Sequence, residues 1–249
     1  MEQKGIIHYF LWLAKKWFKT VASMLPLRKY WLYAVAIKKR RSKMLTIEKL
    51  LLVDKNDLKD ASKTICKDDL PQLVACLAEK DDTIRYQAFL LLQNRSMYFD
   101  DVYPFWDTFY EKLKSDNSYQ RSIGLMLIAE NAKWDKDNRI DATIEEYLLL
   151  LNDEKPITVR QCIQSLRKIV PFKESLHLKI ANEIMNINIA SLRETMRKVI
   201  LMDILSVLAM IQKYKTNDEI ESYIFNAISD GLLDKKAIKQ VKTMLMNTD

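Results

Sequence analysis

The sequence predicts an all-α protein built as a solenoid of about five helical hairpins, and three observations support this prediction. Its 249 residues include only three Gly and five Pro, fewer than the tight turns of a strand-rich fold require. Leu, Ile, Lys, Glu, Ala and Met dominate, and apolar residues recur at the spacing of one helix face. A unit of about 37 residues also repeats along the chain, which is typical of a solenoid.

The repeat is aligned by four arginines, each near the start of an expected helix. They are Arg85, Arg121, Arg160 and Arg197, with spacings of 36, 39 and 37 residues. Three positions after each arginine lies a small or apolar residue: Ala88, Gly124, Ile163 and Ile200. Seven positions after, the chain has Leu92, Ile128, Arg167 and Ile204, so only the third copy departs from the apolar pattern. These positions share one side of a helix and predict its buried face.

Each copy of the repeat is preceded by a second helix-like segment, which completes a hairpin. The expected first helices cover residues 70–80, 104–114, 140–151 and 175–185, and the expected second helices cover residues 83–92, 119–128, 158–167 and 195–204. A last pair covers 217–229 and 234–245, and one helix near 46–66 precedes the first pair. Asp82, Asp116 or Ser118, and Thr158 are expected to cap second helices. A lone hairpin cannot bury its apolar stripe, so the hairpins are expected to stack.

Two motifs resemble a known repeat family. RSIGLMLIAENAKWD (121–135) and NDEKPITVRQCIQSLRKIVPFK (152–173) are similar to a small family of bacterial HEAT-like repeat proteins, and the resemblance covers roughly residues 45–211. It implies a right-handed HEAT-like α-α superhelix. Members of that family are sometimes labelled SufBD-related, a label from iron–sulfur assembly that implies a scaffold role.

Charge divides the chain into two predicted parts. Residues 1–44 contain 11 Lys/Arg and one acidic residue, a net charge of +10, whereas residues 45–249 contain 29 basic and 32 acidic residues, a net charge of −3. We therefore expect a basic N-terminal extension at 1–44 and a HEAT-like solenoid at 45–249. The overall charge of +7 is therefore no evidence that the whole chain binds nucleic acid.

The extension is predicted to form an amphipathic helix or helices rich in aromatic residues. Its longest apolar run, GIIHYFLWLA, has ten residues, too few for the roughly 18–20 that cross a membrane. Four interpretations stay open: a cap on the solenoid, contact with an anionic membrane, contact with nucleic acid, or a natural start at Met44. The candidate residues for membrane or polyanion contact are Trp12, Lys15, Lys16, Lys19, Lys38, Lys39, Arg40 and Arg41.

Candidate binding residues of the solenoid are the four repeat arginines and Trp134. The arginines either line a basic groove or bond to carboxylates and loop carbonyls, which would tie one repeat to the next. Trp134 is either a partly exposed binding anchor or a staple between repeats.

No catalytic, cofactor or metal site is predicted. Cys66, Cys76 and Cys162 form no ligand-like pair and are expected to be buried thiols. Trp106-Asp107-Thr108 resembles a fragment of HEAT-like DNA glycosylases that remove alkylated bases, but Tyr110 stands where that family has its catalytic Asp.

The predicted function is a non-catalytic scaffold or adaptor that binds a protein partner through its second helices, in the cytoplasm or peripherally at the membrane. One alternative is an adaptor recruited to the membrane surface through residues 1–44. The other is a DNA-binding or glycosylase-type protein.

Overall fold

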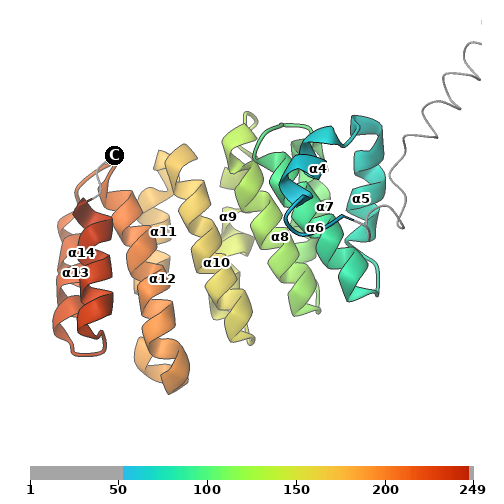
Figure 1. Cartoon of the computed structure of the whole chain (residues 1–249). Helices are drawn as coiled ribbons and strands as arrows, with labels where there is room; N and C mark the ends of the chain where they lie inside the picture. The colour runs from blue at the N-terminus through green and yellow to red at the C-terminus, as the bar shows by residue number, and fades with distance from the viewer. Residues whose placement is uncertain (1–52, 247–249) are drawn as a thin grey trace, which may run out of the picture. The chain divides into compact units, whose positions relative to one another are not determined.

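A computed structural model describes residues 53–246, and every regular element in that part of the chain is helical (Figure 1). The chain separates into two units, Met1–Thr46 and Ile47–Asp249. The basic extension, with its candidate contact residues from Trp12 to Arg41, lies outside the described residues.

Helix α4 (Leu58–Thr64) precedes five helical hairpins in the described residues. The hairpins are α5 (Leu70–Cys76) with α6 (Asp82–Ser96), α7 (Trp106–Leu113) with α8 (Ser118–Asn131), α9 (Arg139–Leu149) with α10 (Pro156–Ile169), α11 (His177–Met185) with α12 (Glu194–Gln212), and α13 (Asp218–Ser229) with α14 (Lys235–Met246). Short 3₁₀ turns cover Lys67–Asp69, Tyr103–Phe105, Ala132–Trp134, Leu150–Asn152, Val170–Phe172, Glu174–Leu176 and Ile189–Ser191. The predicted α-solenoid of about five hairpins is confirmed.

The second helices of successive hairpins pack on one another and form a continuous layer (Figure 1). Helix α8 contacts both α6 and α10, α10 contacts α12, and α12 contacts α14. The residues three positions after the aligned arginines lie in this layer, and Ala88, Ile163 and Ile200 are fully buried. In the third copy, where Arg167 breaks the pattern, Arg167 is exposed and its neighbour Leu166 is buried instead. The repeat alignment therefore predicted the buried face of α6, α8, α10 and α12.

Helices α7 and α8 approach so closely that only glycine fits at position 124. A Cβ atom there would lie 2.7 Å from the backbone oxygen of Phe109 and 3.0 Å from a methyl group of Leu113. The first contact is with backbone, which cannot turn away as a flexible side chain can. Gly124 thus sets the distance between the two helices of this hairpin.

The three predictions of helix caps were wrong. Thr158 is the third residue of α10, and that helix starts after Lys155 without a side-chain cap. The other two helices do have caps. The caps are Asp81, whose carboxylate accepts hydrogen bonds from the backbone N–H groups of Thr83 and Ile84 at 2.8 and 3.2 Å, and Asn117, which caps α8. Each capping residue is extended and immediately precedes its helix, whereas the predicted Asp82 and Ser118 are the first helical residues.

The helix expected near residues 46–66 is also shorter than predicted within the described part. Residues 53–57 precede α4 as a turn, in which the Asp54 side chain accepts the Asn56 N–H at 2.9 Å. Such local side-chain bonds offer the backbone an alternative to the helix.

Replacing Gly124 with alanine is expected to destabilise the protein by about 1–3 kcal/mol, although alanine favours helix more than glycine does. The cause is the contact of the new methyl group with the Phe109 carbonyl. Urea unfolding followed by circular dichroism measures the effect. Glu183→Ala, at an exposed position of α11, is the control and is expected to change the free energy of unfolding by less than about 0.5 kcal/mol. An unchanged or raised stability of Gly124→Ala would contradict the close packing.

Candidate functional site

Two of the repeat arginines bind carboxylates of the next hairpin. The Arg121 guanidinium donates two hydrogen bonds to the Asp153 carboxylate, at 2.5 and 2.9 Å, and also binds the carbonyls of Ser115 and Asp116. Burial alone would raise the pKa of Asp153, but Arg121 and the Lys155 backbone N–H outweigh it and lower that pKa. Arg160 donates to Asp203 of α12 at 2.8 Å.

The other two repeat arginines bind within their own hairpin. Arg85 donates to the Glu79 carbonyl at 2.9 Å and pairs with Asp82. Arg197 donates to the Leu192 and Ala190 carbonyls at 2.9 and 2.8 Å. All four guanidinium groups thus have partners in their own chain, and a binding role for them stays a prediction.

Trp134 is half-buried in the loop after α8 and contacts the preceding hairpin. Its indole N–H donates to the Ser96 carbonyl at the end of α6, at 2.8 Å. The adjacent Lys133 lies 4.8 Å from the Trp134 ring centre and donates to the Met97 carbonyl. These contacts join two successive hairpins, and a role as a binding anchor stays a prediction.

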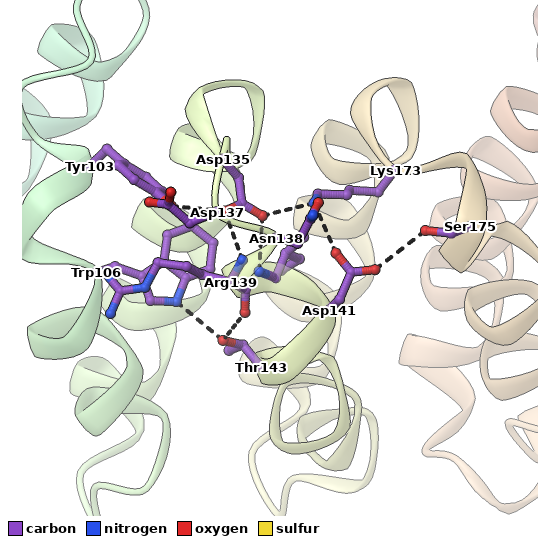
Figure 2. A network of polar contacts seen from close by, with 11 residues as sticks. Tyr103, Trp106, Asp135, Asp137, Asn138, Arg139, Asp141, Thr143, Lys173 and Ser175 are labelled. Carbon is purple, nitrogen blue, oxygen red and sulfur yellow. Dashed lines mark hydrogen bonds and ion pairs between the residues drawn. The ribbon is translucent and has the colours of Figure 1, made fainter.

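A buried ionic network that the sequence analysis missed joins three successive inter-hairpin loops (Figure 2). The carboxylate of Asp135 is fully buried, and the ammonium group of Lys173 lies 2.9 Å from it. Asp135 also accepts the Tyr103 hydroxyl at 2.9 Å and the backbone N–H groups of Arg139 and Ile140 at 2.8 and 3.0 Å. The three side chains come from the loops before α7, α9 and α11 and recur at about the repeat spacing, which is the signal that could have predicted them.

Asp135 and Lys173 can stay charged inside the protein because both groups form ion pairs and hydrogen bonds. Burial alone would raise the pKa of Asp135, but the donors from Ile140, Lys173, Arg139 and Tyr103 outweigh it and lower that pKa below its usual value. Burial alone would lower the pKa of Lys173, but Asp141 and Asp135 outweigh it and raise that pKa. A buried ion pair that lost one partner would leave an uncompensated charge, so the network holds the loops in place.

The glycosylase-like fragment has structural contacts. The Trp106 side chain is buried, and its indole N–H donates to the Thr143 hydroxyl at 3.1 Å. Asp107 pairs with Arg139. A buried indole bonded in this way is not free to stack on a base.

Cysteine and metal chemistry give no further candidate site in the described residues. Cys76 and Cys162 are buried as predicted, but Cys66 is exposed because it lies between α4 and the following 3₁₀ turn rather than within a helix. Among residues 53–246, no group of three or more His, Cys, Asp or Glu side chains is placed to hold a metal ion.

A groove of about 890 Å³ crosses the amino-terminal halves of the second helices α6, α8 and α10. Its wall contains Tyr86, Tyr119 and Ile157, which are 51%, 67% and 54% exposed. Phe89 and Ile123 also line it and are nearly buried, and the Tyr86 and Phe89 ring centres lie 6.3 Å apart. Three successive hairpins therefore supply one depression with exposed apolar side chains.

The charged side chains around the groove are mainly basic. Lys55, Arg85 and Lys155 line it, together with the carboxylate of Asp82. The Lys55 ammonium group lies 6.0 Å from the Tyr86 ring centre, and the Arg85 guanidinium lies 5.7 Å from the Tyr119 ring centre. Both contacts are cation–π interactions with the face of a tyrosine ring.

Comparison with a solved structure supports the fold. An engineered protein of known crystal structure is similar over 82% of this chain and 96% of its own, with 14% identity and a TM-score of 0.51. A designed armadillo repeat protein is similar over 82% of this chain and 98% of its own, with 12% identity and a TM-score of 0.48. At such identity the likeness concerns the fold alone.

No protein-family model matches the chain, and no curated protein matches it. The SufBD-related label therefore gains no support. Within the part of the chain that the structure describes, no helix is long and apolar enough to cross a membrane.

Replacing Lys173 with methionine is expected to destabilise the protein by about 3–5 kcal/mol, because Asp135 is left buried and without its cation. Denaturant unfolding measures the loss. The matched control is Lys179→Met, which removes an ion pair with Glu145 across two hairpins at an exposed position. It is expected to cost less than about 1 kcal/mol, and equal losses in the two variants would contradict the role of burial.

The lowered pKa of Asp135 also predicts a dependence of stability on pH. The folded pKa lies below the ordinary value of 3.8, so the stabilisation is complete above that value and is lost as pH falls through the folded pKa. We expect the free energy of unfolding to fall less steeply below pH 3.8 in Asp135→Asn than in the wild type. Chemical unfolding across an acid pH series tests this, and parallel curves would count against it.

Proposed function

We propose that this protein is a non-catalytic scaffold that binds a segment of a protein partner in the groove across α6, α8 and α10. The observation that carries the proposal is the row of solvent-exposed apolar side chains, Tyr86, Tyr119 and Ile157, supplied by three successive hairpins. An α-solenoid commonly presents such an extended surface to a protein partner.

The composition of the groove supports this function. Tyrosine buries a large apolar ring at a small cost in side-chain entropy and is frequent among residues that dominate binding energy. The cations Lys55 and Arg85 lie over the Tyr86 and Tyr119 rings, which favours the present orientation of both rings before a partner binds.

The resemblance to HEAT-like repeat proteins forms part of the proposal. It agrees with a scaffold role, and the unpaired Cys66, Cys76 and Cys162 agree with the reducing conditions of the cytoplasm. Nucleic acid is the less favoured partner, because residues 45–249 have a net charge of −3.

The double variant Tyr86→Ala/Tyr119→Ala is expected to lose partner proteins that the wild-type chain retains. Affinity capture from the protein's own cells, followed by mass spectrometry, measures this. The control is Phe225→Ala on α13, where a side chain that is 69% exposed lies outside the groove residues. Equal thermal melting of the three proteins shows that the fold is intact. Retention of the same partners by the double variant would refute the groove as the binding surface.

A second proposed function is recruitment to an anionic membrane through residues 1–44. The observation that favours it is the +10 charge of this segment together with eight of the 24 aromatic residues of the chain. Each basic residue near an anionic surface contributes about 1 kcal/mol.

The membrane proposal predicts that neutralising Lys15, Lys16 and Lys19 to glutamine lowers binding to anionic vesicles by more than tenfold, on the basis of about 1 kcal/mol for each charge. Co-sedimentation with phosphatidylserine vesicles measures this, and neutral phosphatidylcholine vesicles are the reference. Lys239→Gln/Lys242→Gln, on α14, controls for the loss of charge elsewhere. Equal sedimentation of all three proteins would exclude the extension as the membrane contact.

A further inference from the structure

We infer that the groove accepts an acidic, apolar peptide segment, in which aliphatic or aromatic side chains are flanked by carboxylates. The inference rests on the proposed function and specifies the chemistry of the partner. It depends on three features that meet at the groove: its basic rim, the amino-terminal ends of three helices and an apolar floor.

The rim has a surplus of positive charge. Asp82 pairs with Arg85, which leaves Lys55 and Lys155 as the remaining charged side chains of the lining. Lys55 is exposed beside Tyr86. Lys155 forms an ion pair with Glu154 at 3.4 Å, but its side chain is 54% exposed, so a bound carboxylate can still reach it. Each of these lysines is placed to attract a carboxylate of a bound segment.

The two lysines lie on opposite sides of α8. Lys55 is beside Tyr86 of α6, and Lys155 immediately precedes α10, while α8 packs between α6 and α10. The loop that carries Lys155 is fixed, because Asp153 accepts the Lys155 backbone N–H at 2.8 Å and is itself held by Arg121. Acidic residues on both sides of an apolar core segment therefore match the rim.

The helix ends add to this positive field. Thr83, Tyr119 and Ile157 line the groove and lie in the first turns of α6, α8 and α10, where the helix dipole places partial positive charge. Asp81 compensates this charge at α6, and Asp153, which accepts the Lys155 backbone N–H, compensates it at α10. By contrast, α8 is capped by the neutral Asn117. The amino-terminal end of α8, between the other two, therefore favours an anion.

The floor selects a protein segment over a polynucleotide. Phe89, Ile123 and Met126 provide apolar contacts below the exposed tyrosines, which suits aliphatic and aromatic side chains. A nucleic-acid strand would place a phosphate every few ångströms along the groove and needs more than the three cations present in the lining.

The probe that tests the inference is a displayed library of random 12-residue peptides, selected on the full chain. Peptides that also bind Tyr86→Ala/Tyr119→Ala are removed, which eliminates those attracted to the basic residues 1–44. We expect the remaining peptides to be net negative and to carry apolar side chains between their acidic residues. Neutral or basic peptides would overturn the inference and leave the proposed function standing. Recovery of no groove-dependent peptide would overturn both.

A charge-reversal variant tests the same peptides quantitatively. Lys55→Glu/Lys155→Glu is expected to weaken the tightest selected acidic peptide by about tenfold or more in fluorescence anisotropy, since two attractive contacts become repulsive. Lys239→Glu/Lys242→Glu, which makes the same charge change on α14, is expected to alter the affinity by less than about twofold. Equal effects of the two variants would overturn the assignment. So would displacement of the peptide by an oligothymidylate that binds the wild type but not the tyrosine variant.

Discussion

Each hairpin of this chain buries its apolar stripe only because the next hairpin lies against it. Ile128 of α8 and Ile204 of α12 are fully buried in the layer that the second helices form by packing on one another. Gly124 allows the first helix of a hairpin to approach this layer as closely as its backbone permits. Because every interface is shared by two neighbours, the stability of the solenoid depends on this stacking more than on any single helix.

Polar contacts at both edges of the layer fix how the hairpins stack. Arg121 joins α8 to the loop before α10 at one end of the second helices, and Asp135 with Lys173 joins successive loops at the other end. Apolar packing alone tolerates small shifts between neighbours, whereas a buried ion pair has partners at defined distances. The Arg121 contact therefore holds the amino-terminal ends of α8 and α10, which form part of the groove, in place.

The architecture could be predicted well from the sequence because similar residues recur about every 37 positions in this repeat. The aligned arginines and the buried positions Ala88, Ile163 and Ile200 all lie in second helices, so the repeat alone predicts these helices. Helix ends were predicted less well, because Asp81 and Asp82 both satisfy a capping pattern and only backbone conformation separates them.

The groove and the ionic network were harder to predict for a different reason. Tyr86 and Tyr119 lie in the aligned segments, but whether a helix face stays exposed depends on how far the neighbouring hairpin covers it. Tyr103, Asp135 and Lys173 are ordinary polar loop residues in the sequence, and only the stacking of three loops brings them together. Both features arise from contacts between residues about one repeat apart, which composition and local spacing do not specify.

The most direct test of the central claim, that the groove is a protein-binding surface, is photo-crosslinking in the protein's own cells. A benzophenone amino acid placed at Tyr119 reports on the groove, and the same group at Phe225 reports on a comparably exposed position of α13, where the side chains are 67% and 69% exposed. Our account predicts a discrete crosslinked protein for the probe at Tyr119 and none for the probe at Phe225. Absence of a crosslink at Tyr119, or the same crosslinked species from both positions, would contradict it.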